Sequence, residues 1–218
     1  MPATRETVAT LLPSLLLMVC ITFLFSPACA AEIIAAGILV DGNETGAGVY
    51  LKDGLVITAA HLVAATDHKM STRLTGLLGP PFEAKVVKHG SFQEGDVDLS
   101  LLGLDVKKLP GRIATFHKEL CKDPPWPGDP VIVVDAAGKI ARTSIVSPNV
   151  IPVQYRAKYP TLIGNVSTTG NSGSGVFDLQ GNCLLGVMSV KFTVGGKDVA
   201  KYFIPAPKIQ AFLPDEFK

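Results

Sequence analysis

Residues 168–177 read TTGNSGSGVF and carry two serines, Ser172 and Ser174, among three glycines. Glycine, serine and asparagine are typical of turns, because they tolerate or favour the backbone angles that turns require. The simplest interpretation is therefore a turn that leads into a strand. A glycine-rich turn also suits a nucleophilic serine, because no side chain obstructs the approach of a substrate to the backbone N–H groups. The rest of the chain decides between these interpretations.

Two earlier segments carry the groups that a nucleophilic serine requires. His61 follows the apolar stretch LVIT, residues 55–58, and Asp98 begins the apolar segment DLSLL, residues 98–102. A serine hydroxyl needs a base, normally histidine, to accept its proton, and a carboxylate to hold the imidazole in the right tautomer. Alone, each residue is ambiguous, since an aspartate at a strand start is usually only a turn residue. Together they supply the parts for acyl transfer.

Short apolar segments alternate with Gly, Pro, Asn and Asp along the chain from about residue 32 to residue 204. This spacing, without long helical patterns between the segments, predicts an all-β protein with antiparallel strands. The segment HKELCKDPPWPGDP, residues 117–130, holds four prolines and cannot be a central strand. We expect a linker at about 116–127, between an N-terminal half, 31–115, and a C-terminal half, 128–218. A short helix is expected over 206–213.

The order of the residues along the chain excludes one class of serine hydrolase. All of the histidines precede Ser172, whereas the histidine follows the nucleophile in α/β-hydrolases. The order His61, Asp98, Ser172 is that of enzymes built from two β-barrels with the active site between them.

Several segments resemble trypsin-like serine endopeptidases, in particular the bacterial HtrA-type and glutamyl endopeptidase branch. GAGVYLKDGLVITAAHLV, 46–63, is similar to the histidine segment, and DLSLL to the aspartate segment. PGDPVIVVDAAG, 127–138, resembles the first strand of the second barrel. TTGNSGSGVFDLQGNCLLGVMS, 168–189, resembles the nucleophile hairpin, and KYFIPAPKIQAFL, 201–213, the last strand and closing helix. The resemblance implies two packed six-stranded antiparallel β-barrels of the chymotrypsin type with a short C-terminal helix.

The resemblance also implies a role for each matching residue. His61 is the general base, Asp98 orients it, and Ser172 is the nucleophile. The N–H groups of Gly170 and Ser172 form the oxyanion hole, and Ser189 supports the aspartate. Polypeptides are then the substrates, and the chemistry requires no cofactor and no metal.

Two residues compete for these roles, and three positions bear on activation and specificity. Asp96 competes with Asp98, and Ser174 competes with Ser172. Asn171 replaces the aspartate that pairs with a new N-terminus in animal enzymes, so activation of that kind is not expected. Val166 stands near the position of the carboxylate in enzymes that cut after Arg or Lys. Lys191 either favours an acidic substrate side chain, shortens the pocket or is a solvated lysine at a strand edge.

Residues 1–30 combine an apolar run, Leu11 to Phe25, with the small residues Ala28 and Ala30, and predict a signal peptide cleaved after Ala30. The mature protein is then secreted or periplasmic, without stable insertion in a membrane. Cys121 and Cys183 remain and either form a disulfide or are two buried thiols. The formal net charge of +1 gives no reason to expect a nucleic-acid partner. A catalytically silent binding protein and a serine esterase on the same fold are the alternatives to an endopeptidase.

Overall fold

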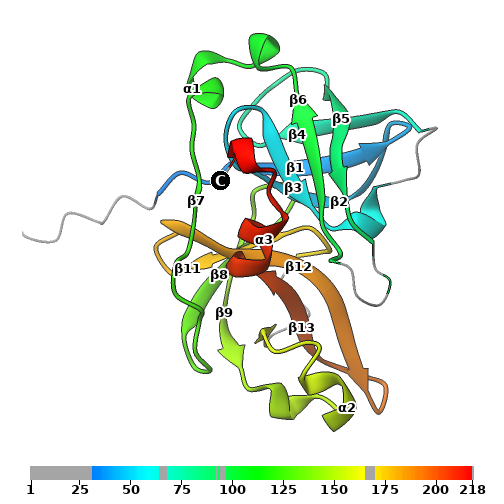
Figure 1. Cartoon of the computed structure of the whole chain (residues 1–218), viewed down its shortest axis with the longest axis vertical. Coiled ribbons are helices and arrows are strands. Elements are labelled where there is room, and N and C mark those ends of the chain that lie inside the picture. The colour runs from blue at the N-terminus through cyan, green and yellow to red at the C-terminus, as the bar shows by residue number, and fades with distance from the viewer. Residues whose placement is uncertain (1–30, 64–67, 92, 94–96, 165–169, 218) are drawn as a thin grey trace, which may run out of the picture.

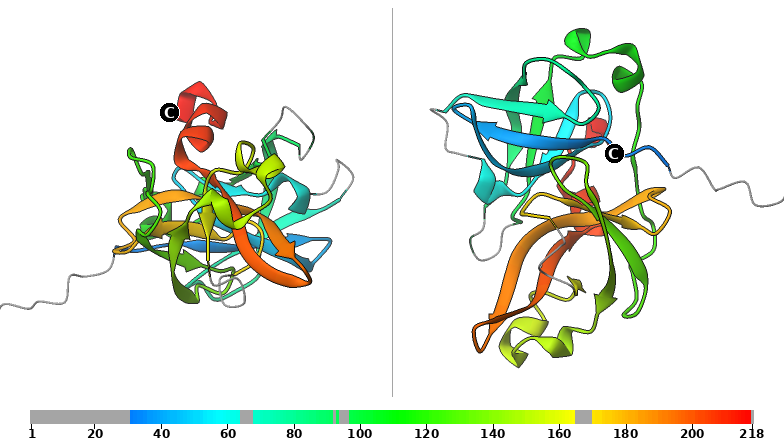
Figure 2. Two further views of the ribbon diagram at one scale, coloured as in Figure 1. Left: turned by 90° about the horizontal axis from the view of Figure 1, so that it is seen from below. Right: turned by 180° about the vertical axis from the view of Figure 1, so that it is seen from behind.

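The computed structural model describes residues 31–63, 68–91, 93, 97–164 and 170–217. Two β-barrels pack against each other, and a C-terminal helix lies beside their junction (Figure 1). The segment that connects the barrels runs along one side of the molecule (Figure 2). Within the described residues, no helix has the length and apolarity needed to cross a bilayer.

The first barrel is a closed ring of six antiparallel strands in the order β1-β2-β3-β6-β5-β4. Its strands are β1 (Ala35–Val40), β2 (Asn43–Tyr50), β3 (Leu55–Thr58), β4 (Met70–Leu74), β5 (Phe82–His89) and β6 (Ser100–Leu104). Large apolar side chains such as Ile38, Tyr50 and Leu102 fill its interior and are fully buried. Closure of the ring gives each of the six strands a neighbour on both sides, and β4 and β5 pair over two residues each.

The second barrel is built in the same way. Its strands are β8 (Pro130–Val134), β9 (Ile140–Val146), β10 (Leu162–Ile163), β11 (Gly175–Asp178), β12 (Cys183–Val194) and β13 (Lys197–Pro205). They follow the order β11-β8-β9-β10-β13-β12, and pairing of β11 with β12 closes the ring. A two-residue strand, β7 (Glu119–Leu120), adds to β12 in parallel. The prediction of two six-stranded antiparallel barrels is therefore confirmed.

The helical segments are short. The α-helices are α1 (Gly111–Ala114), α2 (Val153–Arg156) and α3 (Ala206–Phe212), and the 3₁₀ turns are η1 (Ala60–Leu62), η2 (Val106–Lys108), η3 (Pro148–Val150) and η4 (Asp215–Phe217). Helix α3 ends one residue before the predicted limit. The single-turn helices α1 and α2 each follow a proline, which marks a break in the chain but does not reveal so short a helix in the sequence.

One apolar core extends through both barrels. It joins side chains of the first barrel, such as Ile57 and Leu101, to side chains of the second, such as Phe177 and Val187. Ile209 of α3 also packs into this core. The shared core fixes the two barrels relative to each other, and with them the loops that carry the predicted site residues.

Cys121 and Cys183 form a disulfide with their Cα atoms 5.0 Å apart. It connects the segment that follows β7 to the start of β12. Of the two alternatives left open by the sequence, the structure thus has the disulfide and not the pair of buried thiols.

Candidate active site

Pairing of β3 with β6 brings His61 and Asp98 together. Thr58, at the end of β3, lies opposite Ser100, at the start of β6, so the residues just beyond these ends are neighbours. His61 Nδ1 lies 2.8 Å from Asp98 Oδ2, and the His61 backbone N–H donates to Asp98 Oδ1 at 2.9 Å. Both oxygens of one carboxylate therefore fix the position of His61.

Asp98 also receives a hydrogen bond from the second barrel. The Ser189 hydroxyl, on β12, donates to Asp98 Oδ2 at 2.5 Å. The Asp98 side chain is only 6% exposed, whereas that of His61 is 35% exposed. Burial by itself raises the pKa of Asp98, but hydrogen bonds from the His61 ring, Ser189 and the His61 N–H outweigh it and bring that pKa below its ordinary value. Asp98 is thus held as a carboxylate.

The turn that carries Ser172 is held between the two barrels. The Ala47 N–H of β2 donates to the Ser172 carbonyl at 3.0 Å, and the Gly173 N–H donates to the Met188 carbonyl at 2.8 Å. Gly173 has a φ of 84°, and a Cβ at this position would lie 1.8 Å from the Ala47 carbonyl oxygen. Only glycine permits so close an approach of the turn to β2.

Ser189 links the aspartate to the serine. Its hydroxyl binds Asp98, while its carbonyl accepts a hydrogen bond from the Ser172 hydroxyl at 3.3 Å. Ser189 itself has no partner in the pairing of β12 with β13, because the register shifts between Met188 and Val190. A β-bulge of this kind changes the direction in which a side chain points.

The peptide group between Gly170 and Asn171 is fixed at both ends. Lys201 Nζ donates to the Gly170 carbonyl at 2.7 Å, and the Asn171 N–H donates to the Ser174 hydroxyl oxygen at 3.1 Å. Ser174 is completely buried, and its hydroxyl stabilises the turn from the interior of the protein. Among acceptors in the described part of the chain, none is bonded to the Gly170 or Ser172 N–H.

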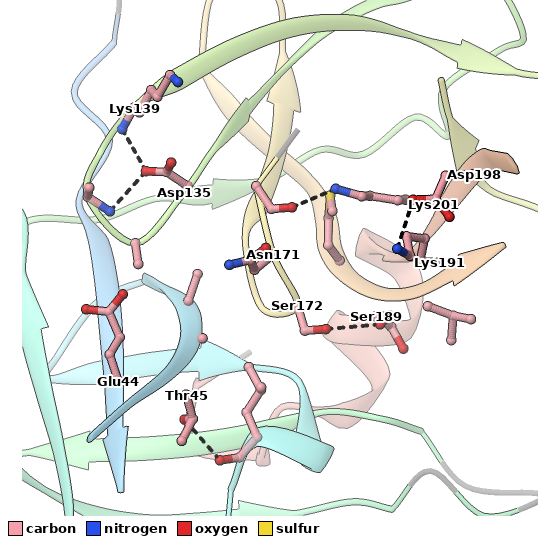
Figure 3. Close-up of a pocket in the computed structure, with 18 residues that line it drawn as sticks. Glu44, Thr45, Asp135, Lys139, Asn171, Ser172, Ser189, Lys191, Asp198 and Lys201 are labelled. Atoms are coloured by element: carbon pink, nitrogen blue, oxygen red, sulfur yellow. Dashed lines mark hydrogen bonds and ion pairs between the residues drawn. The ribbon is translucent and has the colours of Figure 1, made fainter. Parts of the chain in front are cut away.

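The Ser172 turn opens onto a cavity of about 880 Å³ that residues of both barrels line (Figure 3). Its charged lining residues are Glu44, Asp135, Lys139, Lys191, Asp198 and Lys201. The Asp135 carboxylate accepts from the backbone N–H groups of Ala137 and Lys139, at 3.0 and 2.9 Å. Lys191 Nζ lies 2.8 Å from Asp198 Oδ2. The cavity is open, strongly polar and large enough for several residues of an extended peptide.

The structure brings together His61, Asp98 and Ser189, and it connects Ser189 to Ser172. Lys191 lines the cavity, which it must do if it favours an acidic substrate side chain or shortens the pocket. Asp96, Val166 and the predicted signal peptide, 1–30, lie outside the described residues.

Sequence reasoning missed the other charged residues of the cavity. Lys201 carried a signal that was available, because it interrupts the otherwise apolar run VAKYFIP, residues 199–205. A lysine inside such a strand is unusual unless its ammonium group has a polar partner. Glu44, Asp135 and Asp198 stand close to turns, where acidic residues are common, and gave no distinct signal.

Within the described residues, one cluster of potential metal ligands has its ligand atoms within 4.8 Å of one another, and it consists of Cys121, Asp178 and Cys183. Both sulfur atoms are used in the disulfide. Asp178 accepts hydrogen bonds from the Cys183 N–H and the Asn182 side chain. This cluster therefore offers no thiolate ligand.

Two antiparallel barrels with a shared core, and a histidine, an aspartate and a serine-bearing turn at their junction, define a protein of the chymotrypsin fold. A family model described as the trypsin-like peptidase domain matches residues 46–187, well over half of the chain. The chain belongs to this family. No curated protein matches it.

Solved structures with the same fold include bacterial proteases. The MamO protease domain from Magnetospirillum magneticum in its apo form has a TM-score of 0.61 and 23% identity, with 88% of this chain and 100% of that chain covered. The active form of the Rv3671c protease from M. tuberculosis has a TM-score of 0.56 and 20% identity, with 85% and 81% covered. The HtrA-type protease AlgW, with a decapeptide, has a TM-score of 0.57 and 17% identity, with 84% and 63% covered.

Proposed function

We propose that the protein is a serine endopeptidase in which Ser172 is the nucleophile, His61 the general base and acid, and Asp98 the residue that orients His61. The observation that carries the proposal is the series of contacts from His61 through Asp98 and Ser189 to Ser172. These contacts join the first barrel to the second, and the residues at their end, Ser189 and Ser172, line the cavity described above. Membership of the trypsin-like peptidase family supports the same activity.

The reaction follows from these positions. Ser172 Oγ attacks the carbonyl carbon of a peptide bond while His61 Nε2 accepts the hydroxyl proton. Asp98, whose pKa is lowered, stays ionised and stabilises the imidazolium. The N–H groups of Gly170 and Ser172 bind the oxyanion. His61 then protonates the leaving amine, and water releases the acyl group from Ser172 by the same steps in reverse roles.

The Ser172 hydroxyl must change partner before it reacts. Its hydrogen bond to the Ser189 carbonyl, at 3.3 Å, is at the long end of the range for hydroxyl donors. Rotation about a single side-chain bond moves the hydroxyl from one acceptor to another. Contacts of catalytic groups are often long before substrate binds and shorten in the complex.

We further propose that the protein acts on polypeptides outside the cytoplasm. The pattern of residues 1–30 supports export, and the mature chain then begins at Ala31. The disulfide between Cys121 and Cys183 supports an oxidising compartment, secreted or periplasmic.

Hydrolysis by the protein that begins at Ala31 tests the activity. We expect cleavage of a quenched fluorescent peptide library by the wild-type protein and a loss of about 10⁴-fold or more in Ser172→Ala. Ser144→Ala, in β9, is the matched control and should keep the activity. Cleavage of ester but not peptide substrates would indicate an esterase. Peptide binding without turnover would indicate a silent binding protein.

A further inference from the structure

Two lysines lie directly opposite each other in the wall of the catalytic cavity. Lys191 of β12 pairs in register with Lys201 of β13, and both line the cavity beside Ser172 (Figure 3). Like charges directly opposite on antiparallel strands destabilise a sheet. Proteins break local rules of this kind mainly at functional sites, and the stability that is lost there is compensated elsewhere in the fold.

Burial makes the arrangement more costly. Lys201 is only 9% exposed. Burial first, and then the charge of Lys191, lowers the pKa of Lys201, while Asp198 acts in the opposite direction. Asp198 binds Lys191 at 2.8 Å and accepts from the Thr193 hydroxyl at 2.7 Å. On the side of the cavity formed by β12 and β13, Lys191 and Lys201 carry ammonium groups and Asp198 carries a carboxylate. This side therefore has an excess of positive charge.

The opposite side of the cavity has the reverse balance. Glu44, Asp135 and Lys139 lie on the other side of Asn171 and Ser172 (Figure 3). Two carboxylates and one ammonium group give this side an excess of negative charge. The two sides of the cavity therefore differ in charge, and Ser172 lies between them.

Lys201 is also close to the reacting atoms. Its ammonium group donates to the carbonyl of Gly170, whose N–H is a proposed oxyanion donor. The side chain of the substrate residue that supplies the attacked carbonyl branches from the carbon next to that carbonyl. It therefore lies near the Gly170–Ser172 turn and within the reach of a lysine that contacts this turn.

We propose that Lys191 and Lys201, called the lysine pair below, form a pocket for an acidic side chain, Glu or Asp, on the substrate residue whose carbonyl Ser172 attacks. This inference rests on the proposed function. The substrate carboxylate accepts charge-assisted hydrogen bonds from the lysine pair and balances its charge. A neutral side chain adds no negative charge to that of Asp198, which binds Lys191, and a cationic one adds a third positive charge.

Two peptides that differ in a single group provide the test. They carry Glu or Gln, which have the same shape, at the residue that supplies the scissile carbonyl. We expect kcat/KM of the wild-type protein to be about 10- to 100-fold higher for the Glu peptide. Equal values, or a preference for Gln, would overturn the proposal. So would a scan of this position that shows a preference for Lys or for an apolar residue.

Variants then assign the preference to the lysine pair. Lys191→Gln and Lys201→Gln should lower the ratio of Glu to Gln turnover toward one, and Lys201→Arg should retain it. Lys139→Gln, on the other side of the cavity, is the matched control and should leave the ratio unchanged. If Lys201 only holds the Gly170 carbonyl in place, its replacement lowers kcat for both peptides and does not change the ratio. That result, together with an unchanged ratio in Lys191→Gln, would contradict the proposal.

Binding separates this inference from the proposed function. N-acetyl tetrapeptides that end in Glu or Gln are titrated into Ser172→Ala by calorimetry. Tighter binding of the Glu peptide, lost in the Ser172→Ala/Lys191→Gln double variant, supports the pocket even if the wild-type protein has no peptidase activity. Ser172-dependent hydrolysis without discrimination between the peptides supports the proposed function and refutes the pocket.

Discussion

At the scale of single residues, Asp98 is the residue on which the candidate site depends. It is buried, and it binds the ring and the backbone of His61 and the hydroxyl of Ser189. The sequence favoured Asp98 over Asp96 because the apolar pattern of DLSLL begins at Asp98. The sequence could not show that Lys201 or Asp198 faces the cavity, because the face that a strand residue occupies depends on register, and β12 is bulged.

Asp98→Asn should reduce kcat by about 10⁴-fold and leave the fold intact, because an amide favours the wrong tautomer of His61. Steady-state kinetics and circular dichroism check both parts. Asp105→Asn, at the N-cap of η2, is a control outside the site and should keep full activity. Asp98→Asn with nearly full activity would remove Asp98 from the proposed mechanism.

The lowered pKa of Asp98 also predicts how stability depends on pH. Because that pKa is lower in the folded protein than in the unfolded chain, the ionised carboxylate adds stability above the unfolded value of about 3.9. This contribution decreases as pH falls through the folded pKa. The difference in urea stability between wild type and Asp98→Asn should therefore become smaller from pH 7 to pH 3. A difference that stays constant over this range would argue against a lowered pKa.

At the scale of elements, the irregular parts of two hairpins place the site. The bulge at Ser189 lets one residue contact both Asp98 and Ser172, and the left-handed Gly173 lets the nucleophile turn contact β2. The glycine-rich turn was visible in the sequence. The bulge was not, because GVMS at residues 186–189 reads as ordinary strand, and a bulge is set by pairing with a distant strand.

Gly173→Ala tests the close contact between the turn and β2. A Cβ at Gly173 would lie 1.8 Å from the Ala47 carbonyl oxygen, and the φ of 84° adds strain. We expect a loss of about 2–4 kcal/mol in the free energy of unfolding and loss of activity. Gly111→Ala, at the start of α1, is the matched control, because nothing lies within 4 Å of its Cβ. Equal stability of the two variants in urea unfolding would contradict this account of the turn.

At the scale of the whole molecule, the two barrels share an apolar core, and a disulfide connects the segment between them to the second barrel. The sequence predicted the fold, because its strand spacing and the order His61, Asp98, Ser172 are both typical of two-barrel enzymes. It could not predict the parallel pairing of β7 with β12, or choose between a disulfide and free thiols. Both depend on which distant segments meet after folding.

Removal of the disulfide should lower stability without changing the fold. Cys121→Ser/Cys183→Ser restores the freedom of a loop that spans 62 positions in the unfolded chain. We expect a loss of about 2–4 kcal/mol in the free energy of unfolding. Urea unfolding of the double variant measures this loss, and reduction of the wild-type protein should have the same effect. A double variant as stable as wild type would show that the disulfide adds little to the stability of the protein.

The proposed function requires that His61 activate Ser172 across the junction of the barrels. Its most direct test is the rate and position of labelling by a fluorophosphonate, followed by mass spectrometry. We expect one adduct, on Ser172, formed rapidly in the wild-type protein and at least about 10³-fold more slowly in His61→Ala. The claim would be contradicted by no adduct in the folded protein, by an adduct on Ser174, or by equal labelling rates in wild type and His61→Ala.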